Sequence, residues 1–145
     1  MILLEYVRKK KTKGKWFLDS GCSRHMTGDY SKLSSFTSIK NGGTVTFGDN
    51  GKGEILGYGN VGTGSITLIE NVLLVYGLKH NLLSISQLCD KGYEVEFDAS
   101  ICKIVDKKSK NVLFIGYRDQ NVYLFDIEHD MHHEKCLSAL DNNNF

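Results

Sequence analysis

Proline is absent from the 145-residue sequence, and cysteine is scarce. The four cysteines, Cys22, Cys89, Cys102 and Cys136, are widely spaced and include no Cys-x-x-Cys pair. We therefore expect free thiols in a reducing compartment rather than a disulfide framework. Long hydrophobic runs are also missing. The apolar stretch Ile2–Leu4 is too short for a secretory signal or a transmembrane helix, so an intracellular, soluble protein is expected.

Glycine, by contrast, is abundant. Fifteen glycines separate many short runs of β-branched and aromatic residues. Because proline is absent, the turns between these runs depend on Gly, Asn and Asp, which predicts a mostly β domain with tight turns and little helix. A chain of this length supports one core. We assign residues 15–127 to this domain, residues 1–14 to a basic leader or linker, and residues 128–145 to a flexible tail.

Positive charge is concentrated at the start of the chain. Residues 1–15 carry a local charge of +5, whereas the whole chain carries +1. No aromatic residue lies among the basic residues of positions 8–15, which favours a solvated leader over a nucleic-acid contact. We therefore expect neither a nucleic-acid nor a membrane partner for the domain.

Local patterns predict the elements of this domain. The apolar run Trp16–Leu18 stops at Asp19 and predicts a buried strand that leads into a loop, and the Asn50-Gly51 pair predicts the tip of a β-hairpin. Strands are expected at Thr44–Phe47, Glu54–Val61, Ser65–Val75, Tyr93–Phe97, Ile101–Val105, Val112–Tyr117 and Val122–Ile127. The polar stretch Ser31–Gly43 is interpreted as a connection. Asn81–Leu88 is expected to form a short amphipathic helix.

Candidate chemistry follows the first strand, where Asp19 precedes Ser20 and Gly21. An acid protease needs such a group, because glycine lets the backbone approach a substrate closely and the hydroxyl can hydrogen-bond across a pair of such loops. The apolar strand would keep the carboxylate poorly solvated, so that two such carboxylates could share one proton. Asp-Ser-Gly alone also describes an ordinary turn, so the surrounding residues must decide.

Two longer segments carry a resemblance. Residues 16–27 read WFLDSGCSRHMT, and residues 71–88 read NVLLVYGLKHNLLSISQL and are followed by GYEVEF at 92–97. In this order they resemble the copia-type retrotransposon proteases, which are relatives of the retroviral pepsin-like enzymes. The tail from Cys136 to Phe145 resembles the stretch that precedes the zinc-binding integrase region in plant copia-type polyproteins. The chain would then be a piece of a longer Gag-Pol polyprotein.

The resemblance implies a retropepsin-like closed β domain with one short helix, active as a symmetric homodimer. Asp19 would be the catalytic carboxylate, Ser20 the residue that hydrogen-bonds across the dimer, and Gly21 a contact to the substrate backbone. The flap would be the hairpin around Gly48, Asp49, Asn50, Gly51, Lys52 and Gly53. The implied activity is aspartic endopeptidase cleavage of the element's own polyprotein, without a metal or an organic cofactor. The implied location is cytoplasmic, with retrotransposon virus-like particles as one setting.

Two positions depart from the retroviral pattern. Leu82-Leu83-Ser84 stands where those relatives end in two apolar residues and Gly, and Cys22 stands where they usually carry Ala. We interpret Cys22 as a buried, inert thiol.

Three other hypotheses remain open. The fold could serve as a catalytically silent binding or dimerisation module, because Asp19 is necessary but not sufficient for catalysis. Cys22 and His25 could be read as a nucleophile pair, although their spacing on a turn favours a role in shaping the loop. The third hypothesis is a zinc site in the tail, formed by His129, His132, His133 and Cys136, with Cys89 or Cys102 as further ligands.

Overall fold

The computed structural model describes residues 13–47, 51–63 and 65–128. These residues form mainly β-strands, together with one short 3₁₀ helix and one short α-helix. The elements are β1 (Trp16–Asp19), β2 (Met26–Thr27), η1 (Tyr30–Lys32), β3 (Ser35–Ser38), β4 (Thr44–Phe47), β5 (Gly51–Thr63), β6 (Ile66–Val75), β7 (Asn81–Ser84), α2 (Ile85–Asp90), β8 (Tyr93–Phe97), β9 (Ile101–Asp106), β10 (Val112–Asp119) and β11 (Val122–Phe125). None of the helices among the described residues is long and apolar enough to cross a membrane.

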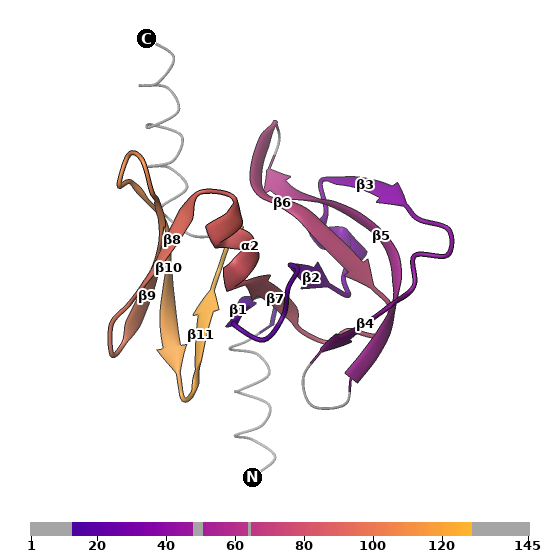
Figure 1. The fold of residues 1–145 in the computed structure, drawn as a ribbon, viewed down its shortest axis with the longest axis horizontal. Coiled ribbons are helices and arrows are strands. Elements are labelled where there is room, and N and C mark those ends of the chain that lie inside the picture. Colours follow the sequence, from indigo (N-terminus) through magenta and orange to yellow (C-terminus); the bar gives the residue numbers. More distant parts are fainter. Residues whose placement is uncertain (1–12, 48–50, 64, 129–145) are drawn as a thin grey trace.

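The strands join in one continuous sheet. Its order is β3-β5-β6-β2-β7-β1-β11-β10-β9-β8, and β4 pairs with β5 outside this path. The expectation of a mostly β domain with one short α-helix is confirmed. The expected closed sheet is wrong for the described strands, because β3 and β8 each pair on one side only and leave the path open. Figure 1 shows β8–β11 on one side and β3–β6 on the other, with β1, β2, β7 and α2 between them.

The centre of the sheet has an interleaved connection. β1 runs parallel to β7, with Asp19 opposite Ser84, and β2 runs antiparallel to β7, with Met26 opposite Leu82. β7 therefore lies between the two strands that the 20–25 loop connects. The loop must pass across the end of β7, which brings residues from two distant parts of the sequence together.

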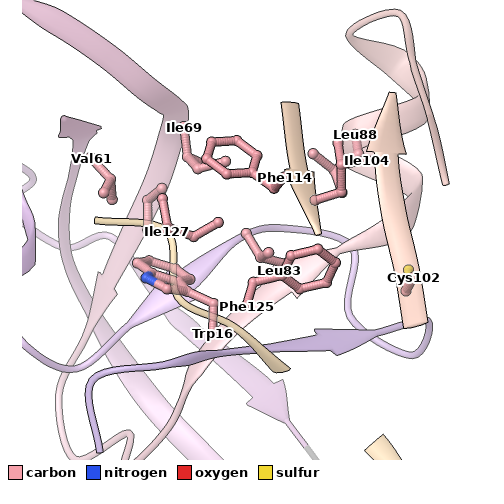
Figure 2. Close-up of a cluster of buried hydrophobic side chains, with 11 residues drawn as sticks. Trp16, Val61, Ile69, Leu83, Leu88, Cys102, Ile104, Phe114, Phe125 and Ile127 are labelled. Atoms are coloured by element: carbon pink, nitrogen blue, oxygen red, sulfur yellow. The ribbon is translucent and has the colours of Figure 1, made fainter. Parts of the chain in front are cut away.

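Two apolar clusters hold this centre in place. The larger cluster contains side chains from β5 and β6 as well as from β9–β11, and so connects the two groups of strands. Figure 2 shows Trp16, Leu83 and Phe125 packed within it beside Ile127. All four of these side chains are fully buried. The smaller cluster lies under the loop and consists of Cys22, Met26, Leu73, Val75 and Leu78, with Val45, Phe47, Ile55 and Leu82 packed against it. Burial of these clusters is the main favourable contribution to the stability of the fold.

The expected hairpins are present, but one expected element is wrong. The strands from Thr44 to Val75 and from Tyr93 to Phe125 lie close to the predicted ranges. Asn81–Leu88 was expected to be a single helix, whereas Asn81–Ser84 is a strand and the helix begins only at Ile85. Pairing with β1 and β2 on both edges supplies backbone hydrogen bonds that outweigh the local helical pattern.

The polar connection contains structure that the sequence pattern did not predict. Within Ser31–Gly43, the 3₁₀ helix η1 continues to Lys32 and β3 pairs with β5 from Ser35 to Ser38. Gly59 permits this pairing, because a Cβ there would lie 1.9 Å from the Ser35 carbonyl oxygen. Because Gly59 has no side chain, the polar strand β3 can approach β5 closely.

Candidate active site

Asp19 lies at the end of β1, where a buried strand meets the surface. Its side chain is partly buried, and Oδ1 accepts a hydrogen bond of 2.7 Å from the Gly21 backbone N–H. Ser20 and Gly21 are exposed beside it. The motif therefore presents one oriented carboxylate at a surface where a second molecule can approach the Ser20 hydroxyl and the Gly21 backbone.

The loop behind this carboxylate is fixed by buried polar contacts from β7 and α2. The Ser84 hydroxyl donates to the Cys22 carbonyl oxygen at 2.8 Å, and the Ser84 backbone N–H donates to His25 Nδ1 at 2.9 Å. The His25 backbone N–H donates to Gln87 Oε1 at 2.8 Å. Buried polar groups are costly without partners, so these three bonds give the loop one strongly preferred conformation.

Ser84 also caps the helix. Its Oγ accepts a hydrogen bond of 3.2 Å from the Gln87 backbone N–H, the usual contact of an N-cap serine. The backbone is extended at this residue, with φ −87° and ψ 121°, so no glycine is required for conformational reasons. The departure from the Gly of the retroviral pattern therefore adds a hydroxyl that links loop and helix without straining the backbone.

Gln87 extends the same network to β6. Its Nε2 donates to the carbonyl oxygens of Asn71 at 3.0 Å and Glu70 at 3.3 Å. A second link joins Thr27 Oγ1 to Asn81 Oδ1 at 2.6 Å, and Asn81 Nδ2 donates to the Lys15 carbonyl oxygen. The supporting residues Ser84, Gln87, Thr27 and Asn81 were not identified from the sequence. Only the occurrence of polar side chains beside apolar positions could have indicated them.

Cys22 and His25 do not form a nucleophile pair. Burial, and then the charge of Asp19, raise the pKa of the Cys22 thiol to about 11, and its Sγ lies 3.7 Å from the Asp19 carbonyl oxygen. Burial, and then the charge of Arg24, lower the pKa of His25 to about 4. The imidazole is neutral at pH 7, and its Nδ1 already accepts the Ser84 N–H. The thiol stays protonated and the histidine shapes the loop, as the spacing on a turn suggested.

The hairpin that was expected to act as a flap is partly described. Its residues Gly48, Asp49 and Asn50 lie outside the described residues, whereas Gly51, Lys52 and Gly53 begin β5. The base of the hairpin packs against the small cluster that contains Cys22. A Cβ at Gly53 would lie 2.3 Å from Val75 Cγ1, so the strand approaches β6 closely there. Hairpin and loop thus share one apolar support.

The zinc hypothesis receives no support from the described part of the chain. His129, His132, His133 and Cys136 lie outside it. Cys89 is an exposed free thiol and Cys102 is a buried one. Among the described residues, no three His, Cys, Asp or Glu side chains are grouped so that they could hold a metal ion.

The pKa of His25 predicts a loss of stability in acid. The folded-state pKa of about 4 lies below the ordinary 6.5, so the unfolded chain binds a proton that the folded chain excludes. This contribution is complete above pH 6.5 and is lost as the pH falls towards 4, and it amounts to roughly 3 kcal/mol. Urea unfolding at several pH values should show that the free energy of unfolding depends less on pH in His25→Asn than in the wild type. The asparagine amide oxygen can still accept the Ser84 N–H. Equal pH dependence in both proteins would contradict the assignment.

Replacement of Ser84 tests the link between loop and helix. We expect Ser84→Ala to lower the free energy of unfolding by about 1–3 kcal/mol, because the buried Cys22 carbonyl loses its donor and α2 loses its cap. The matched control is Ser86→Ala, since Ser86 is exposed and its hydroxyl hydrogen-bonds Ser84 Oγ at 3.1 Å, so its removal leaves the Cys22 carbonyl and the α2 cap with their Ser84 partner. Similar small changes in both variants, measured by urea unfolding, would show that the hydroxyl is dispensable.

Comparison with known proteins places the chain in a family. A family described as Pol polyprotein, beta-barrel domain matches residues 16–93, which include β1, the Asp19 loop, the hairpin, β7 and α2. The retrovirus-related Pol polyprotein from transposon RE1 of Arabidopsis thaliana is 28% identical over 115 residues, and that from transposon RE2 is 30% identical over 112 residues. Each alignment covers 74% of this chain and 8% of the relative, so the chain spans less than a tenth of those polyproteins. No solved structure matches the chain. Because the family match covers more than half of the sequence, the chain belongs to the Pol polyprotein β-barrel domain family.

Proposed function

We propose that this domain is a copia-type aspartic endopeptidase that acts as a symmetric dimer, with Asp19 of each protomer in a shared catalytic pair. The observation that carries the proposal is the position of Asp19. Its partly exposed carboxylate follows a strand with a fully buried Trp16, and buried hydrogen bonds to β7 and α2 fix the loop that presents it. Catalytic groups must be held in one geometry by such supporting contacts.

Two Asp19 carboxylates at a twofold axis would work as acid and base. Like charges at close range cannot both ionise easily, so the pair holds one proton. The ionised carboxylate takes a proton from a bound water, which attacks the scissile carbonyl carbon. The protonated carboxylate donates a hydrogen bond to the carbonyl oxygen and stabilises the charge that develops there. The leaving amine then takes the proton that the first carboxylate removed from the water, the peptide bond breaks, and the pair again holds one proton.

The need for a dimer follows from the number of motifs. Asp19 is the one aspartate in the sequence that is followed by Ser or Thr and then Gly. A single chain cannot supply two such groups, whereas an isologous interface brings the same loop from each protomer to the axis. The exposure of Ser20 and Gly21 supports this arrangement, because both residues remain available to a partner loop.

The proposed substrate is an extended segment of a retrotransposon polyprotein. The hairpin of β4 and β5 would cover the peptide, and its shared apolar support with the Asp19 loop would couple flap position to the catalytic floor. An extended peptide can pair its backbone as an added strand and place alternate side chains in pockets. Both Arabidopsis relatives are named Pol polyproteins, which supports a polyprotein as the substrate class.

Substitution of Asp19 tests the catalytic role. We expect Asp19→Asn to lower the rate of cleavage of a flanking polyprotein fragment by at least about 10²–10⁴-fold, because the amide cannot act as acid or base. Its melting temperature should stay near that of the wild type. Asp90→Asn is the matched control, since Asp90 is exposed on α2, and it should keep full activity. Full activity of Asp19→Asn would overturn the proposal, and no cleavage by the wild type would favour the silent binding module.

Dilution tests the shared pair. We expect specific activity to fall as the protein is diluted through its dimer dissociation constant, in step with the loss of dimer. Sedimentation velocity and activity should be measured on the same dilution series. Wild-type protein mixed with excess Asp19→Asn should lose activity, because most wild-type chains then occupy heterodimers. A monomeric population with undiminished specific activity would exclude the shared pair.

A further inference from the structure

A group of basic side chains surrounds an open cavity at the start of β1, away from the Asp19 end of that strand. The cavity has a volume of about 410 Å³. Three segments of the chain meet there, and their charged or titratable side chains are those of Lys13, Lys15, Asp29, Lys32, Lys79 and His80. We call this group the basic cavity. The three segments are far apart in the sequence, so the fold itself assembles the charge.

The basic cavity carries a net positive charge, because four lysines in its lining face the carboxylate of Asp29 and that of Glu128, which contacts Lys32. Lys32 Nζ contacts the Glu128 carboxylate at 3.6 Å and donates to the Gly14 carbonyl oxygen at 3.0 Å. Within the described part of the chain, Lys13, Lys15 and Lys79 form no ion pair. Asp29 is the one carboxylate in the lining, and its Oδ1 already accepts from the Ser31 backbone N–H and hydroxyl. Three ammonium groups therefore remain available for an anionic ligand.

The backbone that carries these lysines is held in place. Asn81 Nδ2 donates to the Lys15 carbonyl oxygen, and Trp16 pairs with Asn81 between β1 and β7. The rings of Phe17 and His80 lie 4.7 Å apart, between their centroids. These contacts fix the segments of Lys15 and Lys79 relative to each other. The ligand would therefore meet lysines whose backbone positions are set before it binds, which lowers part of the entropy cost of binding.

Exposed aromatic rings occur in the same segments as the lysines. Tyr30 is 63% exposed and lies between Asp29 and Lys32 in the sequence, and Tyr76 is 71% exposed three residues before Lys79. The ring of Tyr30 also makes an edge contact with the ring of Phe36. Binding sites for single-stranded nucleic acids combine a basic groove that follows the phosphates with rings on which bases can stack.

We propose that the basic cavity binds the phosphodiester backbone of single-stranded nucleic acid. Charge complementarity favours this ligand, because the free lysines match a chain of closely spaced monoanions. Residues 8–11 add four basic positions immediately before this segment in the sequence. The expectation of no nucleic-acid partner rested on residues 1–15 alone, whereas the fold brings Lys32 and Lys79 to the same place. This function is independent of the proposed proteolysis.

The test measures binding of fluorescein-labelled polyuridylate to the full chain by fluorescence anisotropy, with Asp19→Asn in every protein so that binding is read without proteolysis. We expect the double variant Lys15→Gln, Lys79→Gln to reduce the slope of log K against log salt by about 1.4, since each phosphate contact on a single strand contributes about 0.7. At 0.1 M salt this corresponds to a roughly 25-fold weaker affinity. Polyadenylate should behave similarly, because backbone contacts carry little base preference.

The matched control is Lys107→Gln, Lys108→Gln, which removes the same charge from exposed lysines that do not line the cavity. It should leave the slope and the affinity near those of the parent. The double variant Lys15→Arg, Lys79→Arg should retain binding, because it keeps both charges. The single variant Lys79→Gln changes an exposed residue, so it should show about half of the slope change without affecting the fold.

Binding measurements with other polymers define the ligand and the outcomes that overturn the proposal. Single-stranded DNA of the same length distinguishes a backbone site from one that needs the 2′-hydroxyl, and binding of either polymer supports the proposal. Polyglutamate should bind much more weakly. Three results would overturn the proposal: equal losses in the cavity and control variants, unchanged binding in the cavity variant, or polyglutamate binding as tight as that of polyuridylate.

Discussion

The Ser84 hydroxyl is the contact on which the arrangement of the site depends. It is fully buried, donates to the carbonyl of the Asp19 loop and accepts from the first turn of α2. Water cannot replace either partner at that position, so a broken bond would leave buried polar groups unsatisfied. The loop, the end of β7 and the start of the helix are therefore constrained together.

This constraint explains how a motif of three small residues can present a defined carboxylate. Ser20 and Gly21 are exposed, and the Asp19 carboxylate accepts a hydrogen bond from within the motif, the Gly21 N–H. The rigidity comes from behind the loop, where His25 and Gln87 exchange hydrogen bonds with the backbone. A neutral His25 suits this position, because an imidazolium could not accept the Ser84 N–H. The neighbouring thiol and imidazole thus serve packing and geometry, and the Asp19 carboxylate is the side chain that the loop orients at the surface.

Much of the fold follows from local pattern, and the errors have a common cause. The β4–β5 hairpin and the alternating strand Tyr93–Phe97 could be predicted because turn residues and periodicity are local signals, whereas the predicted tip at Asn50 lies outside the described residues. Asn81–Ser84 could not, since its extended conformation depends on two partner strands supplied from elsewhere in the chain. The supporting side chains were missed for the same reason. Thr27 and Asn81, for example, are 54 residues apart and meet only in the folded sheet.

The position of β7 between β1 and β2 has a consequence for synthesis. The Asp19 loop is among the first parts of the domain to leave the ribosome, yet the residues that fix it lie about sixty positions later, and β11 pairs with β1 later still. Contacts of such long sequence separation form late in folding. A growing polypeptide therefore carries the aspartate motif for some time before it has an ordered loop, and β1 gains its β11 partner only when almost all of the described part of the chain has emerged.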